Sequence, residues 1–172
     1  DIDTILLAYG CCGNGLIGLK SVTADLIIPK TDDCISMVLC KPGEKFNRLK
    51  ETYFLTKGWI DSSKGLMAEY TRAVERYERI FKLMLKSYKY LMLIDTDSYN
   101  IDEYVFPAKD VADLTHLELI IEQGGTWLLE KLLTGPYDRD FCIIPKGEEV
   151  KICHFGYEDA QAPNQAMDFF NP

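Results

Sequence analysis

Short apolar runs alternate with helical patterns along the whole chain, and this alternation limits the fold more than any other feature of the sequence. The runs show no polar–apolar alternation, so they predict strands that are covered on both faces, as in a parallel sheet. There are six of them, at residues 4–9, 24–28, 53–56, 90–94, 117–121 and 141–144. The pattern predicts the α/β class, with a doubly wound, mostly parallel, Rossmann-like sheet and helices on both of its faces.

Helical spacing of apolar residues predicts helices between these runs. The predicted helices span residues 15–20, 34–40, 44–50, 65–88, 101–114 and 126–133. The longest of them is the crossover between three strands before it and three strands after it. No linker rich in Gly, Ser or Pro interrupts the chain, so we predict one domain over residues 1–172, with an irregular tail after about residue 153. The chain enters a strand almost directly after Asp1, and we expect that an upstream segment is missing from it.

The charge balance excludes some classes of partner. The chain has 27 acidic and 19 basic residues, for a net charge of −8, whereas proteins that bind polyanions rely on Lys and Arg. No apolar run approaches the roughly 20 residues that cross a bilayer. We therefore predict a cytoplasmic protein without a nucleic-acid or membrane partner.

Six cysteines raise the question of disulfides. The chain is well supplied with core residues and shows no secretory signal, so we predict reduced cysteines. Reduced cysteines either pack as small apolar residues or act as ligands and nucleophiles. They are Cys11, Cys12, Cys34, Cys40, Cys142 and Cys153.

Polar and reactive residues are concentrated in the loops that follow the predicted strands. These loops span residues 10–15, 29–34, 57–59, 95–98, 122–126 and 145–148. In an open parallel sheet, ligands bind outside the carboxyl ends of the strands. The sequence therefore predicts a cysteine-bearing pocket at that edge.

Three cysteines lie in the first two of these loops. Cys11 and Cys12 precede a predicted helix, where the helix dipole favours thiolate, and Gly13 and Asn14 would allow a cofactor to approach. A tight turn with buried thiols is the alternative. Cys34 begins the next helix, and its loop and the first loop follow neighbouring strands, so Cys34 is expected to converge with Cys12, or with Cys11 as the alternate. Thiolates from separate loops can hold zinc or an iron–sulfur cluster, although the spacing fits no standard motif.

Other residues are candidates for cofactor binding. Trp59 would form one wall for a flat cofactor, and Asp95 would bind a hydroxyl or Mg²⁺. Gln123, Gly124 and Gly125 resemble a small anion-binding turn. Packing and plain turn formation are the alternatives for these residues.

Other features carry weaker signals. Asp32 and Asp33 are more typical of helix caps than of ligands. Cys40 and Cys142 are expected to pack, and Cys153 beside His154 is weak evidence for a ligand pair. No dinucleotide fingerprint or P-loop is present.

Several motifs together carry a family resemblance. They are Tyr9-Gly10-Cys11-Cys12-Gly13-Asn14-Gly15, then Ile28-Pro29 with Asp33-Cys34-Ile35, then Thr52-Tyr53-Phe54-Leu55-Thr56 with Gly58-Trp59-Ile60. With them the chain resembles DUF1638, an uncharacterised domain-of-unknown-function family of methanogens, acetogens and other anaerobes. The resemblance implies a site at Cys12 and Cys34, a further cysteine-containing turn upstream, and a setting near corrinoid-dependent methyl transfer.

These observations lead to three hypotheses. The first is a metal- or cofactor-binding protein of anaerobic one-carbon metabolism, with Cys12 and Cys34 as ligands of zinc or an iron–sulfur cluster, a corrinoid as another cofactor, and a small molecule or corrinoid protein as partner. The second is a non-catalytic binding module with reduced structural cysteines. The third is a metal-free enzyme with Cys12 as nucleophile, which lacks a convincing histidine partner.

Overall fold

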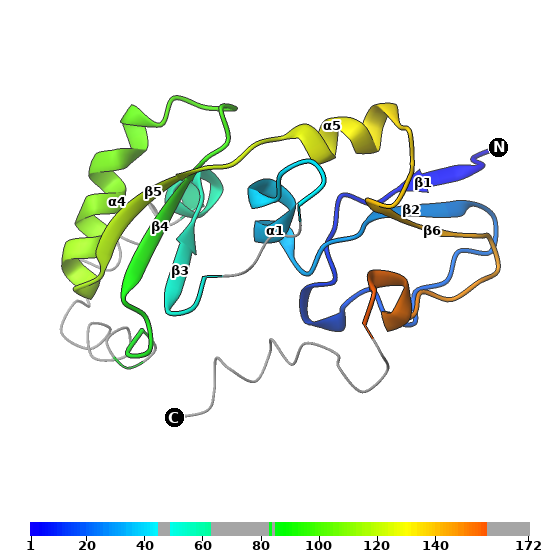
Figure 1. Cartoon of the computed structure of the whole chain (residues 1–172), viewed down its shortest axis with the longest axis horizontal. Coiled ribbons are helices and arrows are strands. Elements are labelled where there is room, and N and C mark those ends of the chain that lie inside the picture. The colour runs from blue at the N-terminus through cyan, green and yellow to red at the C-terminus, as the bar shows by residue number, and fades with distance from the viewer. Residues whose placement is uncertain (45–48, 63–82, 84, 158–172) are drawn as a thin grey trace. The chain divides into compact units, whose positions relative to one another are not determined.

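The computed structural model describes residues 1–44, 49–62, 83 and 85–157, and these residues contain all six predicted strands (Figure 1). The strands form two three-stranded sheets, in the orders β1-β2-β6 and β3-β4-β5. Their bounds are Thr4–Leu6 for β1, Asp25–Pro29 for β2, Thr52–Leu55 for β3, Tyr90–Asp95 for β4, Glu118–Gln123 for β5 and Phe141–Ile144 for β6.

Most strand pairs are parallel, as predicted. β1 and β2, β3 and β4, and β4 and β5 pair in parallel, whereas β6 runs antiparallel to β2. The α/β class is therefore confirmed, with the strands divided between two sheets. The chain also divides into two compact units, one of residues 1–46 and 126–172 and the other of residues 47–125. The assignment of residues 1–172 to one domain stays a prediction.

Three predicted helices are confirmed: α1 at Cys34–Leu39, α4 at Asp102–Thr115 and α5 at Trp127–Thr134. The helix predicted at 15–20 is wrong: a 3-10 turn, η1 at Cys12–Asn14, ends just before this stretch, and turns follow over residues 15–18. Gly13 and Asn14 have φ of 54° and 61°, a left-handed conformation that ends a right-handed helix. The predicted helices at 44–50 and 65–88 lie largely outside the described residues, as does the tail after a second 3-10 turn, η2 at Ile152–Phe155.

Both faces of β2 are covered, which explains its continuous apolar run. Leu26 and Ile28 pack into one cluster with Ile144, whereas Ile27 faces the opposite way and packs with Leu128 of α5 and Met37 of α1. Successive side chains of a strand point to opposite faces, so each face needs its own apolar partner.

The second unit follows the same rule. Leu91 and Leu93 of β4 are fully buried and pack against Tyr104 and Ala108 of α4. The fully buried Met92 lies between them on the opposite face. In the described part of the chain, no helix is long and apolar enough to cross a membrane.

Replacing Leu128 with Ala should lower the free energy of unfolding by about 2–5 kcal/mol, because Leu128 is 2% exposed and its removal leaves a cavity. The matched control is Leu133→Ala on the same helix. Leu133 is 73% exposed, so this change should stay within about 0.5 kcal/mol. Denaturant unfolding measures both values, and equal effects would contradict this packing of α5.

Candidate functional site

The loops after β1 and β2 lie side by side, as the parallel pairing of these strands requires. The backbone contact continues beyond the strands: Leu7 N donates to Ile27 O at 2.9 Å, and Cys11 N donates to Thr31 O at 2.9 Å. Residues that follow the two strands therefore meet at one edge of the first sheet, as predicted.

Gly10 sets how closely the two loops approach. Gly10 is buried, and a β-carbon at this position would lie 2.7 Å from the carbonyl carbon of Asp33 and 2.8 Å from its α-carbon. Backbone atoms cannot move aside as a flexible side chain can, so only glycine fits at this point. The contact places Cys12 and Cys34 next to each other.

The two close loops bring Cys12 near Cys34, and the neighbouring Cys12 affects the pKa of Cys34. Burial raises the pKa of Cys34, and Cys12 and the Asp33 carboxylate raise it further. Cys34 is exposed and Cys12 is partly buried, so the pair is accessible from solvent. These two cysteines are the ones that the sequence analysis expected to converge.

Cys11 has different surroundings from this pair. It is 0% exposed, and its thiol points to Asn14 Oδ1 at 4.0 Å. Burial raises the pKa of Cys11, as do Asp32 and Cys12. Among the described residues, no group of three or more His, Cys, Asp or Glu side chains is arranged to hold a metal ion.

The expected activation of Cys11 and Cys12 by a helix dipole is wrong, because a 3-10 turn and no α-helix lies between these cysteines and β2. The loop turns through η1 instead, with Gly13 and Asn14 in the left-handed conformation. The surroundings of Cys11 favour the protonated thiol, because burial disfavours the charged form.

The two aspartates before Cys34 have structural partners. Asp33 caps α1, and its Oδ1 accepts hydrogen bonds from the backbone N of Ser36 at 2.7 Å and from its hydroxyl at 2.8 Å. The Tyr157 hydroxyl donates to Asp32 Oδ1. Burial and this bond raise the pKa of Tyr157. The cap predicted from the sequence is therefore confirmed at Asp33.

The remaining candidate cofactor residues lie in the second unit. At the carboxyl ends of β4 and β5, Gly124 N donates to Asp95 O at 2.7 Å, and Gln123 Nε2 donates to Asp97 Oδ2 at 3.0 Å. Asp95 Oδ1 accepts from Asp97 N at 3.0 Å. These polar groups thus bond to one another.

Trp59 lies in a helical stretch over residues 57–62, so the loop predicted at 57–59 is wrong, and Gly125 is the last residue of this unit. The Trp59 ring lies edge-on to Tyr53, with ring centres 6.2 Å apart, and packs against the core cluster of the unit. Gly125 is partly buried and immediately precedes Thr126, the N-cap residue of α5. Their assignment to a cofactor site stays a prediction.

All six cysteines are free, as predicted. The Cys40 thiol donates to Met37 O at 3.6 Å, and the buried Cys142 thiol donates to His154 O at 3.1 Å. Burial raises the pKa of Cys142 to about 12. His154 Nδ1 accepts from Lys151 N, so it forms a local turn contact beside the exposed Cys153.

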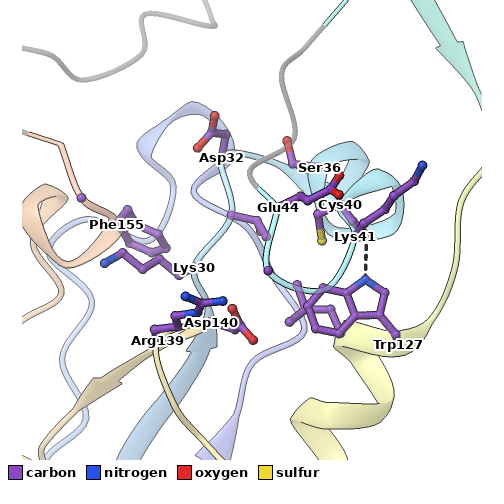
Figure 2. Close-up of a pocket in the computed structure, with 14 residues that line it drawn as sticks. Lys30, Asp32, Ser36, Cys40, Lys41, Glu44, Trp127, Arg139, Asp140 and Phe155 are labelled. Atoms are coloured by element: carbon purple, nitrogen blue, oxygen red, sulfur yellow. Dashed lines mark hydrogen bonds between the residues drawn. The ribbon is translucent and has the colours of Figure 1, made fainter.

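A pocket of about 340 Å³ opens on the first unit next to the loop after β2. Its lining includes Lys30 and Thr31 from this loop, Trp127 from α5, and Arg139 and Asp140, which precede β6. Figure 2 shows Lys30, Phe155 and Arg139 on one side of the pocket and Trp127 on the other.

The sequence does not predict this pocket, because its pattern suggests a parallel β6. A parallel β6 would place residues 145–148, which follow the strand, at the edge of the predicted site. In the antiparallel arrangement these residues lie at the opposite edge, where Lys146 N donates to Asp25 Oδ1 at the start of β2. Arg139 and Asp140 come before β6 and therefore share the edge with Lys30. The clustered charges at 138–140 were the available signal.

The model of the family described as "Protein of unknown function (DUF1638)" matches residues 1–133 of the chain. The resemblance noted in the sequence is thus confirmed. Among curated proteins and among solved structures, no match to the chain was found.

Replacing Gly10 with Ala should lower the free energy of unfolding by about 1–3 kcal/mol, because the new β-carbon collides with the Asp33 backbone. Gly58→Ala is the control, since a β-carbon there meets nothing within 4 Å. Denaturant unfolding compares the two variants. An equal response would contradict the close approach of the two loops.

Replacing Cys12 with Ala should lower the pKa of Cys34, because Cys12 contributes to raising it. Thiolate is the form that reacts, so the midpoint of Cys34 alkylation should move to lower pH. Mass spectrometry of iodoacetamide-labelled peptides across a pH series measures this midpoint. Cys153→Ser should leave it unchanged, and an unchanged midpoint in the Cys12 variant would contradict the proximity of Cys12 to Cys34.

Proposed function

Because the chain belongs to DUF1638, a family of proteins of unknown function, we propose a role from its own residues: Cys12 and Cys34 bind a soft metal ion or a metal-bearing cofactor. The observation that carries this proposal is the close approach of the two loops that supply Cys12 and Cys34 at one edge of the first sheet. The effect of Cys12 on the pKa of Cys34 agrees with it. Thiolate sulfur is the preferred ligand of zinc and of iron–sulfur clusters.

The charges around the pair support a cation as ligand. Asp33 raises the pKa of Cys34, and Asp32 acts in the same way on Cys11. Next to these carboxylates, the negative charge of a thiolate is costly unless a cation is present. A metal ion would offset the charge of the thiolates and take the place of their protons.

Two protein thiols do not complete a four-ligand zinc site, which leaves positions for a further ligand. In zinc enzymes such open positions receive water or substrate, and zinc keeps a bound thiol deprotonated. Cys12 and Cys34 would hold the ion, and Asn14 and Asp33 would flank it. The donor set thus fits a metal that acts on an incoming molecule better than a closed structural site.

The setting that we propose is anaerobic one-carbon metabolism, from the resemblance to a family associated with corrinoid-linked methyl transfer. A zinc-held thiol is a suitable acceptor for alkyl transfer, which would make a small thiol or a corrinoid protein the partner. An iron–sulfur cluster would instead support electron transfer or cofactor maturation.

The alternative of a metal-free nucleophile has less support. Burial raises the pKa of Cys11 and Cys34, so these two cysteines are poor substitutes for Cys12 as the nucleophile. The side chain of His154 is engaged with Lys151 N. Among the described residues, neither histidine side chain forms a hydrogen bond with Cys12 or Cys34, so the His–thiol pairing typical of cysteine nucleophiles is not formed.

Anaerobically purified protein should bind about one equivalent of Zn²⁺ or Co²⁺, and Cys12→Ser or Cys34→Ser should each lower the affinity at least tenfold. Co²⁺ should give a sulfur-to-cobalt charge-transfer band that both variants lose. Affinity should rise with pH, because binding displaces thiol protons.

The control is Cys153→Ser, which changes an exposed cysteine elsewhere in the first unit and should bind like the wild type. Binding of Co²⁺ without the sulfur band would place the ion elsewhere. Absence of metal binding would leave the non-catalytic binding module as the better hypothesis.

A further inference from the structure

The pocket next to the loop after β2 combines features of a ligand site that the metal proposal does not use. Lys30 follows β2, and its backbone N donates to Asp140 O at 2.8 Å. This bond fixes Lys30 opposite Arg139 at the same edge of the first sheet. The pocket between them has a volume of about 340 Å³, within the range of small-molecule sites.

Positive charge prevails among the groups of the pocket that lack an ion-pair partner. Lys30, Lys41 and Arg139 form no ion pair with any described residue. Asp140 shares the Lys131 ammonium with Asp138, since Lys131 Nζ lies 2.6 Å from Asp140 Oδ2 and 2.8 Å from Asp138 Oδ1. That leaves Asp32 and Glu44 as the opposing carboxylates. Lys30 and Arg139 come together at this edge without an ion-pair partner among the described residues, so both are available to an anionic group of a ligand.

A buried hydroxyl in the lining also lacks a partner. Thr31 is 8% exposed, and its Oγ1 is the single buried side-chain oxygen or nitrogen without a hydrogen bond among the described residues. A buried hydroxyl without a partner costs about 1–3 kcal/mol, so such groups are normally satisfied. A ligand in the pocket would supply the missing partner.

The lining contains an aromatic surface as well. Trp127 Nε1 donates a hydrogen bond to Cys40 O at 2.6 Å, and this bond fixes the orientation of the indole. Phe155 is 7% exposed and lies on the side of Lys30 (Figure 2). Fixed aromatic rings offer an apolar contact for a flat ligand at little entropic cost.

We propose that this pocket binds a small organic anion. Its phosphate or carboxylate group lies at Lys30 and Arg139, an oxygen atom bonds to Thr31, and an apolar body lies against Trp127. Arg is suited to this task because its planar fork matches phosphate and carboxylate oxygens. The site is separate from the Cys12 and Cys34 thiols and does not depend on metal binding.

The two tryptophans of the chain provide the test, because Trp127 lines the pocket and Trp59 lies in the other unit. The full chain, labelled with ¹⁵N, is titrated with phenyl phosphate, benzoate and neutral phenol. We expect a saturable shift of the Trp127 indole N–H signal with at least one anion and no shift of the Trp59 signal. The anion that binds more tightly distinguishes a phosphate from a carboxylate ligand.

Variants separate the proposed contacts. Arg139→Gln and Lys30→Gln should each weaken binding about tenfold or more, because each removes a charged hydrogen-bond donor. Lys146→Gln changes an exposed lysine outside the pocket and should bind like the wild type. Cys34→Ser should also retain binding, which distinguishes this site from the metal site.

Thr31→Val is the sharpest variant, because it should leave the thermal stability of the free protein equal or higher while weakening anion binding. A merely structural hydroxyl would give the opposite pattern. The proposal is overturned if neither anion shifts the Trp127 signal, if phenol shifts it as strongly as the anions do, or if Arg139→Gln and Lys30→Gln both bind with unchanged affinity.

Discussion

The close approach of Gly10 to the backbone of Asp33 is the contact on which the arrangement of the candidate site depends. A β-carbon at residue 10 would lie 2.7 Å from backbone atoms, so the loops after β1 and β2 reach this distance only with glycine. Cys12 helps to raise the pKa of Cys34, so the charged forms of the two thiols would not hold the loops together. The backbone therefore imposes the thiol pair, together with the bond from Cys11 N to Thr31 O.

The direction of β6 determines which residues join Lys30 at the edge of the first sheet. An antiparallel partner enters the sheet where its neighbour leaves it, so Phe141 pairs with Pro29. The residues before Phe141 then join those after Pro29 at one edge, and Arg139 comes to lie in the same pocket as Lys30. A parallel β6 would have placed the Pro145–Glu148 loop at this edge and would have removed Arg139 from it.

The sequence predicts what depends on local pattern and misses what depends on strand direction. Apolar runs such as 90–94 identify strands because both faces are buried, and the cap at Asp33 follows from the residue type before a helix. The convergence of Cys12 with Cys34 follows from parallel pairing of neighbouring strands.

The direction of β6 depends on how Leu128 and Phe141 pack with Ile27, a contact between distant residues that no local pattern encodes. The turn after Cys12 was missed because Gly13 and Asn14 take left-handed conformations within a stretch of ordinary helix-forming spacing.

The loop from Lys30 to Cys34 serves both candidate sites, and its charges differ along its length. Lys30 lies at the pocket with Arg139, whereas Asp33 lies at the thiols, and Asp32 lines the pocket while raising the pKa of the nearby Cys11. A cation at the thiols and an anion in the pocket would each offset the charge that the other leaves uncompensated. Opposite ligand charges on one short loop favour joint occupancy over competition, and any such coupling is reciprocal by thermodynamic linkage. The pocket lining contains neither Cys12 nor Cys34, so such coupling would pass through this shared loop and not through a shared ligand.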